Sequence, residues 1–210
     1  MTIELYQHLS LYGDVYSTTH KLHDPNAFIE WSEKNFKYVK YNPRKDVNRY
    51  GLSITSLNGG LDGVPDLDSL YEYNKENDVR YRERDFKTLT PVYKYENLKK
   101  ILEPISSHLF RSHVIRLDPG GFFPPHRDFR GMILDSFRVI IPLANMNPPA
   151  FTFIVDGNIQ HWNYGNLYFV NTAKMHYLFN ASFSPAYMAV LNVDLTVDTI
   201  EFITNNLKER

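Results

Sequence analysis

The stretch PPHRDFRG, at positions 124–131, contains a histidine and an aspartate two positions apart. In extended backbone, residues i and i+2 point to the same side, so His126 and Asp128 can present an imidazole nitrogen and a carboxylate oxygen to one point. Both atoms are metal donors. A chain with eight histidines can also contain this pair by chance, in which case the two residues serve as a turn residue and a strand cap.

A metal site of this type needs a further ligand, because the facial triad of non-haem iron combines two histidines with one carboxylate. After the pair, the chain contains His161 and His176. His176 follows a predicted strand and turn, fifty residues after His126, and this separation is typical of a jelly-roll metal site. His161 lies beside a predicted hairpin, which favours a surface or turn position. We therefore predict that His126, Asp128 and His176 bind the metal.

The letters HRD also begin the catalytic loop of protein kinases. That motif requires an asparagine five residues after the aspartate, and this sequence has Ile133 there. The sequence also lacks the glycine-rich phosphate loop that precedes the motif in kinases. These residues exclude a kinase.

The elements that position the ligands follow from the periodicity. Segments 24–39 and 95–110 carry apolar residues at helical spacing, and Pro104 predicts a break in the second. Segment 49–60 reads as a strand that runs into a glycine turn. From residue 111 the chain changes to short strand-like runs at intervals typical of an antiparallel sandwich or barrel. These runs are 112–118, 136–144, 150–157, 158–163, 165–171, 174–181 and 186–195, and the last segment, 198–210, reads as a helix.

This order predicts an α+β protein with a double-stranded β-helix core, that is, a jelly-roll or cupin-like core, and supporting helices before it. We expect one domain over residues 1–210. In it, residues 1–110 form a helical supporting and substrate-recognition region, 111–196 the metal-site core, and 197–210 a C-terminal helix.

The composition limits the remaining function classes. With 23 basic and 24 acidic residues and a net charge of -1, the chain gives no electrostatic reason to expect nucleic acid or an anionic membrane as partner. No apolar run approaches the roughly 20 residues that span a bilayer, and the N-terminus has no signal-peptide pattern. We therefore expect a cytoplasmic protein without a membrane partner. The chain has no cysteine, so metal ligands must be His, Asp or Glu.

Residues 111–194 carry a set of motifs in a fixed order. A Pro-Gly turn at 119–120 precedes the His126 pair, and a strand with Arg138 then ends in Ile-Pro-Leu. A Trp-x-x-Gly turn at 162–165 follows, and Asn180 comes four residues after His176. In order and spacing, this set resembles the 2-oxoglutarate/Fe(II) oxygenases of the aspartyl/asparaginyl β-hydroxylase-like group, which includes small-molecule proline hydroxylases.

The resemblance implies a function and cofactors. It implies that Fe(II) is bound by His126, Asp128 and His176, and that 2-oxoglutarate and O2 are cosubstrates. It further implies hydroxylation of a C–H bond of an amino acid or of an amino-acid side chain, free or in a peptide. The expected partner is thus a small-molecule amino acid or a peptide.

The sequence departs from this group at the anchor for the distal carboxylate of 2-oxoglutarate. The group usually places an arginine about ten residues after the second histidine, and this chain has Ala186 there. Arg138 is the best replacement, because it shares a strand face with Ile140 and a guanidinium in an apolar strand needs an anion. Lys174 is the second candidate. Arg138 could instead form an internal salt bridge or contact a substrate carboxylate.

The missing arginine leaves a second function open, a non-oxidative metal-binding cupin-like protein that does not use 2-oxoglutarate. For substrate contacts the sequence offers Arg127 and Arg130, which flank the metal ligands. Arg49 and Tyr50 are further candidates for a carboxylate or a peptide backbone. The charged segment 78–86 reads as a solvated edge.

Overall fold

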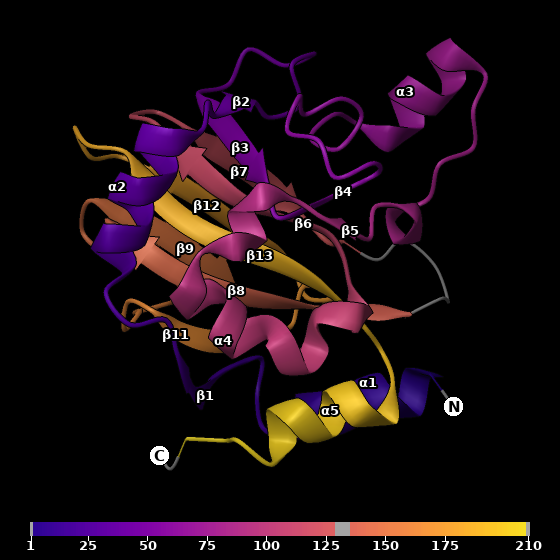
Figure 1. Ribbon diagram of the computed structural model, residues 1–210. Helices are drawn as coiled ribbons and strands as arrows, with labels where there is room; N and C mark the ends of the chain where they lie inside the picture. Colours follow the sequence, from indigo (N-terminus) through magenta and orange to yellow (C-terminus); the bar gives the residue numbers. More distant parts are fainter. Residues whose placement is uncertain (1, 129–134, 209–210) are drawn as a thin grey trace.

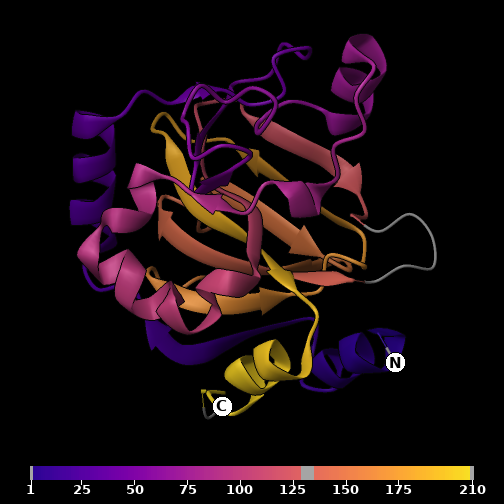
Figure 2. The same ribbon diagram turned by 45° about the vertical axis from the view of Figure 1, so that its right-hand side comes forward.

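The core of the molecule consists of two antiparallel sheets that face each other (Figures 1 and 2). The structure is a computed structural model that describes residues 2–128 and 135–208. Apart from β9 and β10, which form a hairpin in the smaller sheet, successive strands from β6 to β13 alternate between the sheets. Their order is β11-β8-β13-β6 in the larger sheet and β10-β9-β12-β7 in the smaller one. This is the strand order of a double-stranded β-helix, so the predicted α+β class and jelly-roll core are confirmed.

The core strands lie close to their predicted positions. The predicted run 136–144 coincides with β8, whereas the predicted run 158–163 contains only the short β10. The segment before Asp128 forms β7, a strand that was not among the predicted runs. The bounds are β6 Leu109–Leu117, β7 Phe122–His126, β8 Ser136–Ala144, β9 Phe151–Val155, β10 Asn158–Ile159, β11 Asn166–Val170, β12 His176–Asn180 and β13 Ala186–Asp194.

Strands from the first half of the chain extend the larger sheet at both edges. β1 (Val15–Lys21) pairs with β11 at one edge. At the other edge β3 (Arg49–Ser53) pairs with β6, and β2 (Val39–Lys40) pairs with β3 as the outermost strand. β4 (Thr55–Ser56) and β5 (Thr88–Leu89) form a separate two-stranded ribbon. The first half of the chain is therefore part of the sheet as well as its support.

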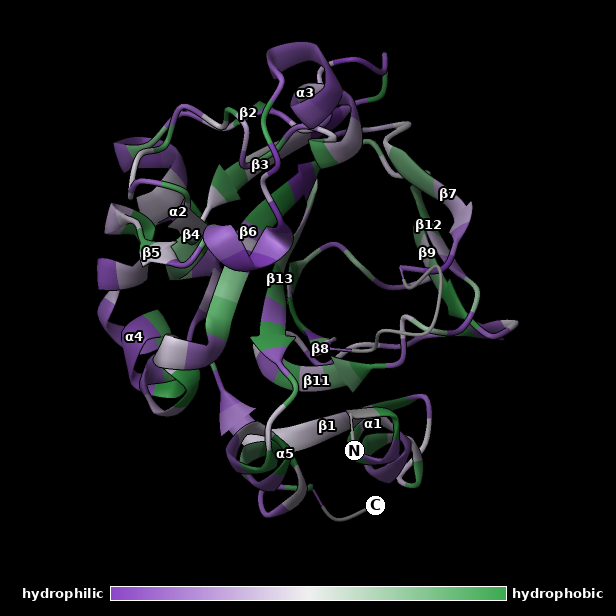
Figure 3. Ribbon diagram, turned by 90° about the vertical axis from the view of Figure 1, so that its right-hand side faces the viewer, coloured by the Kyte–Doolittle hydropathy of each residue, from purple (hydrophilic) through white to green (hydrophobic). Residues whose placement is uncertain are grey.

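The helices cover the larger sheet on its outer side. α2 (Pro25–Asn35) and α4 (Glu96–Leu102) lie against its outer face, and α1 (Thr2–Ser10) and α5 (Val197–Thr204) lie beside each other near β1 (Figures 1 and 3). Among the described helices, none is long and apolar enough to cross a membrane. The remaining helical segments are α3 (Leu70–Asn77) and the 3-10 helices η1 (Glu83–Asp85), η2 (Pro91–Lys94) and η3 (Glu103–His108).

The helix ends follow local chemistry. The Asp24 side chain accepts a hydrogen bond from the Ala27 amide at 3.0 Å, and Pro25 occupies the first helical position of α2. α4 ends at Leu102 and continues as η3, because Pro104 has no amide hydrogen for an α-helical bond. α5 ends at Thr204, so the predicted C-terminal helix is shorter than expected.

Two apolar cores lie on the two faces of the larger sheet. Alternate residues of one strand go to opposite faces, so Val114 and Val139 pack toward the helices, and Ile115 and Ile140 pack toward the smaller sheet. Phe153 of β9 meets the second pair from the other side. Polar side chains replace this interior core at one end of the jelly roll, where the candidate site lies.

Candidate metal centre

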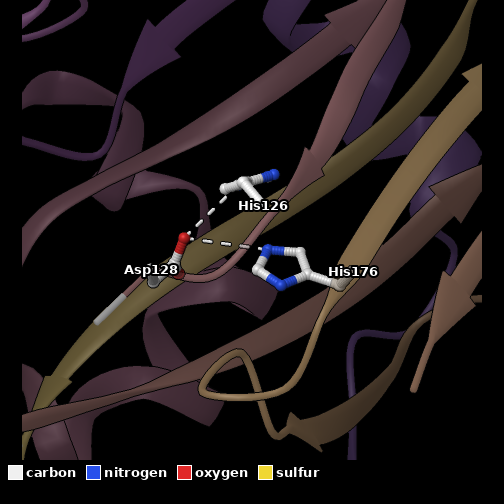
Figure 4. Close-up of side chains that lie close together, drawn as sticks. All are labelled: His126, Asp128 and His176. Atoms are coloured by element: carbon white, nitrogen blue, oxygen red, sulfur yellow. Dashed lines mark ion pairs between the residues drawn. The ribbon is translucent and has the colours of Figure 1, made fainter. Parts of the chain in front are cut away.

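Two paired strands of the smaller sheet position the histidines. His126 is the last residue of β7 and lies directly opposite His176, the first residue of β12. Asp128 Oδ1 lies 3.4 Å from His126 Nε2 and 3.7 Å from His176 Nε2 (Figure 4). One ligand atom from each side chain lies within 4.8 Å of the other two. The structure thus brings the three predicted ligands together.

Backbone carbonyls orient both imidazole rings. His126 Nδ1 lies 2.7 Å from the Pro124 carbonyl oxygen, and His176 Nδ1 lies 3.1 Å from the Lys174 carbonyl oxygen. With Nδ1 facing a carbonyl in each ring, both Nε2 atoms face the Asp128 carboxylate. Once any proton between His126 and Asp128 is lost, three electron-pair donors face one point, and this N2O set suits a divalent metal.

The electrostatics of the triad favour an ionised carboxylate. Burial alone would raise the pKa of Asp128, but the positive charge of Arg138 and the hydrogen bond with His126 hold that pKa well below its ordinary value. Burial lowers the pKa of His176, which keeps its ring neutral. The hydrogen bond with Asp128 raises the pKa of His126, while the charge of Arg49 acts in the opposite direction. Metal binding at neutral pH is therefore coupled to loss of any proton on His126.

The triad lies in a cavity between the two sheets. The cavity has about 110 Å³ of room for the centres of water-sized molecules, comparable with the roughly 150 Å³ cavities that hold a benzene ring. Its size therefore suits a small ligand. Its apolar wall comes from Tyr41, Ile115, Phe123, Ile140, Phe153, Leu178, Met188 and Val190, and its polar wall, besides the triad, from Glu83, Arg111, His113, Arg138, Thr172 and Asn192.

Arg138 links the triad to the polar wall. Its Nε lies 2.9 Å from Asp128 Oδ2, and its Nη2 lies 3.4 Å from Glu83 Oε2. It faces the interior on β8 together with Ile140, as the alternation predicted. Burial disfavours the charge of Arg138, but the two carboxylates raise its pKa above the ordinary value. Arg138 is therefore a charged side chain in the cavity.

The second half of this polar wall was not predicted from the sequence. Glu83 Oε1 accepts a hydrogen bond from Arg111 Nη1 at 2.8 Å, and Asn192 Nδ2 lies 3.5 Å from Glu83 Oε2. Glu83 comes from η1, inside the segment predicted as a solvated edge, and this prediction is wrong for Glu83. Arg111 lies at a bulge of β6 with a φ of 37°, one residue before the predicted start of that strand.

His113 completes the polar wall. Burial, together with the charges of Arg111 and Arg138, lowers the pKa of His113 to about 3, so the ring is neutral. Arg111, His113 and Ile115 alternate along β6, and this alternation was the signal that would have found the two polar residues.

The other predicted contact residues lie at different distances from the cavity. Lys174 is partly exposed and pairs with Asp156 at 3.0 Å, and it does not line the cavity. Arg127 is also exposed and outside the lining. Arg130 lies outside the described residues. Of the two predicted anchor residues, Arg138 lines the cavity and Lys174 does not.

Arg49 and Tyr50 point to opposite faces of β3. Tyr50 packs against the core on the helix side of the larger sheet, under the guanidinium of Arg116 at 5.1 Å. Arg49 is buried, with its guanidinium over the ring of Phe123 on the cavity side. His161, the alternative third ligand, is exposed and does not belong to the triad.

Asn180 has a structural position. It is fully buried, and its Nδ2 donates to the carbonyl oxygens of Leu117 and Ser184, each at 2.9 Å. Its Oδ1 accepts a hydrogen bond from the Ser182 hydroxyl at 2.7 Å. Asn180 thus fastens the end of β12 to β6 and to the following turn, which holds the His176 strand in place.

Among three similar solved structures, one matches over nearly the whole chain and supports this fold. A protein from Burkholderia pseudomallei described as an oxidoreductase of the 2OG-Fe(II) oxygenase family matches with a TM-score of 0.51 and 11% identity, covering 93% of this chain and 91% of that one. An RmlC-like cupin from Shewanella frigidimarina matches at 0.31 and 17%, covering 44% and 71%. A protein of unknown function from Streptococcus pyogenes matches at 0.31 and 15%, covering 41% of this chain and 65% of that one, which is less than two thirds of its length.

A comparison with the curated proteins found no match. The family described as aspartyl/asparaginyl beta-hydroxylase matches residues 70–196, which is more than half of the chain. The matched range contains the whole triad and the polar wall of the cavity. The family match indicates a hydroxylase-type oxygenase. This chain belongs to the aspartyl/asparaginyl beta-hydroxylase family.

Proposed function

We propose that this protein is an Fe(II)- and 2-oxoglutarate-dependent oxygenase that hydroxylates a C–H bond of an amino acid, free or within a peptide. The convergence of His126, Asp128 and His176 at the inner wall of a small cavity carries the proposal. Two neutral imidazoles and one carboxylate are the ligand set that non-haem iron takes with open positions for a cosubstrate and oxygen. Bound iron would supply the oxidation of 2-oxoglutarate and of the substrate by O2.

The protein's own residues would hold the ligands and exclude water. Arg138 is the candidate anchor for the distal carboxylate of 2-oxoglutarate, because it is a buried guanidinium next to the triad and its planar fork matches a carboxylate. Its contact with Asp128 would also keep one carboxylate oxygen away from the metal. Phe153 and Leu178 would keep the reacting region apolar.

One observation favours a second function. The two ion pairs of Arg138 already join it to carboxylates of the chain, and the inward residues of β13, Met188, Val190 and Asn192, provide no further cation. A metal-binding cupin-like protein that does not use 2-oxoglutarate would have such a site. The two functions differ in whether 2-oxoglutarate reaches the metal.

The first experiment measures that difference. The protein is loaded with Fe(II) without oxygen, 2-oxoglutarate is added, and the visible absorption of iron with a bound keto acid is recorded. Oxygen is then admitted and succinate is measured. We expect both signals in the wild type and in His161→Ala, and neither in Asp128→Ala or His176→Ala. An unchanged iron spectrum together with no succinate would favour the cupin-like protein.

Arg138→Gln tests the anchor. If Arg138 holds the distal carboxylate, the Kd for 2-oxoglutarate in this variant should rise about 30-fold or more. A loss of this size is typical when one member of a buried charge pair is removed. If Arg138 only positions Asp128, the Kd for iron should rise roughly 10- to 100-fold instead, with an unchanged Kd for 2-oxoglutarate at saturating iron. Lys174→Gln is the matched control, and it should change neither constant.

A further inference from the structure

Arg49 is a buried arginine with no anionic partner among the residues that the structure describes. Only 4% of the surface of Arg49 is exposed, and its Nε has no hydrogen-bond partner. In the two described ranges, 2–128 and 135–208, no carboxylate lies within 4.0 Å of its guanidinium. The two other arginines near the cavity, Arg111 and Arg138, both contact Glu83. Arg49 therefore differs from them in having a charge that the chain does not neutralise.

The register of β3 directs Arg49 toward the cavity side of the larger sheet. Arg49 lies opposite Leu117 of β6, and Leu117 belongs to the interior core. The guanidinium carbon lies 4.4 Å from the ring centroid of Phe123 and 5.5 Å from that of Tyr41. Both rings line the cavity, so the cation lies directly behind this part of the wall.

The same wall leads to the metal triad. The ring of Phe123 lies 6.4 Å from the ring of His126, centroid to centroid, and the two rings are stacked. The charge of Arg49 acts on the His126 imidazole, although less than the Asp128 contact does. An anion bound at Arg49 would therefore lie beside Phe123 of β7, whose ring is the neighbour of His126.

A buried cation without an anion is costly, and burial lowers the pKa of Arg49 accordingly. Stacking on aromatic rings offsets only a small part of this cost, so the two rings do not replace a charged partner. A guanidinium donates through a planar fork that matches a carboxylate with two parallel hydrogen bonds. The missing partner is best supplied by a ligand.

We propose that Arg49 binds a carboxylate of the organic substrate, which rests on the oxygenase function proposed above. The substrate would then be a small acid or an acidic residue with its carboxylate at the Tyr41 and Phe123 wall and its reacting carbon toward the triad. The carboxylate has two sources, the α-carboxylate of a free amino acid or the side chain of Asp or Glu in a peptide. Arg138 would hold the cosubstrate on the other side of the cavity.

The experiment uses the full chain loaded with Zn(II), so that binding is measured without turnover. The probes are the free L-amino acids and their carboxyamides, and short peptides containing Asp or Glu with their Asn or Gln counterparts, each followed by saturation-transfer NMR. At least one acid should bind, and its amide should bind about 30-fold more weakly or not at all. This comparison needs no variant. Preference for a free acid or for an acidic peptide identifies the source of the carboxylate.

Arg49→Gln should abolish the preference for acid over amide, and Arg49→Lys should retain part of it. Arg116→Gln is the matched control, because Arg116 also stacks on tyrosine rings but lies on the outer side of the sheet. It should keep the wild-type preference. Thermal unfolding of each variant checks that it folds.

Three results would overturn the inference: no acid binds, acid and amide bind equally, or Arg49→Gln weakens 2-oxoglutarate binding but not substrate binding. Succinate formation without an Arg49-dependent acid preference would sink this inference and keep the oxygenase function. An Arg49-dependent preference without any succinate would contradict the oxygenase function. Arg49 would then be the carboxylate site of a binding protein.

Discussion

Asp66 is a buried carboxylate whose charge destabilises the folded protein. It is 2% exposed, and Oδ1 accepts a hydrogen bond from the Leu57 amide at 3.0 Å. Burial raises the pKa of Asp66 to about 6, although the Leu57 amide lowers it. The unfolded chain has a pKa of about 3.9 at this group. The folded state therefore holds a proton more tightly, and stability falls as pH rises from about 4 to about 6.

Asp66→Asn keeps the acceptor for Leu57 and removes the charge. We expect the free energy of unfolding to exceed that of the wild type by about 2 kcal/mol at pH 7 and by much less at pH 4, where the aspartate is protonated. Urea denaturation at both pH values measures the difference. Asp46→Asn, at an exposed position, should show no such pH dependence. An equal gain at both pH values for Asp66→Asn would contradict the assignment.

Residue types explain why some site residues could be predicted. His126, Asp128 and His176 belong to the few side chains that bind iron, and their spacing reflects two paired strands. Arg138 was identified because a charged side chain is unusual on the inward face of an otherwise apolar strand. Glu83 could not be predicted, since a short 3-10 helix has no periodic pattern and reaches the cavity only through tertiary packing. Arg49 was one of several basic candidates until the register of β3 placed it.

The turn at Gly165 shows how one element fixes three strands. Gly165 has a φ of 83°, its amide donates to the Pro142 carbonyl, and its carbonyl accepts from the Leu22 amide, both at 2.8 Å. The turn therefore joins the ends of β1 and β8 to the start of β11. A Cβ at this position would collide with the carbonyl oxygen of Leu22.

Gly165→Ala should therefore lower the free energy of unfolding by about 3 kcal/mol or more, from the left-handed conformation and the collision together. Gly157→Ala is the matched control, because Gly157 has a φ of 82° and no atom within 4 Å of a Cβ. It should lose only about 1–2 kcal/mol. Urea denaturation measures both losses, and equal values would show that the collision is relieved by movement of β1.

The elements that could be predicted were those with strong internal patterns. The strands of the second half are apolar runs between turn residues, so their bounds followed from composition. β1 was not predicted because VYSTTHK is mostly polar, and it is a strand only through its pairing with β11. α3 was also missed, since none of its described residues is buried and it has no apolar face to detect.

On the scale of the whole molecule, one domain over residues 1–210 stays a prediction that the two tryptophans can test. Trp31 lies in α2, in the region predicted to support the core, and Trp162 lies in the interior core. β1 and β3 pair with strands of the second half, so both regions should unfold together. The fluorescence of Trp31→Phe and of Trp162→Phe, each compared with circular dichroism, should give coincident urea transitions. A separate early transition in Trp162→Phe, whose remaining tryptophan is Trp31, would divide the chain into two units.

The charged residues of the polar wall and of the triad balance one another in the cavity. Two cations, Arg111 and Arg138, face two anions, Glu83 and Asp128, so these four groups sum to zero. Ferrous iron and the 2-oxoglutarate dianion also sum to zero, so under the proposed function the loaded cavity stays neutral. Either cofactor alone would leave an excess of two charges in a low-dielectric space, which makes their binding mutually supportive. Under the carboxylate-binding proposal, the positive charge of Arg49 would then be paired with the single carboxylate group of the substrate.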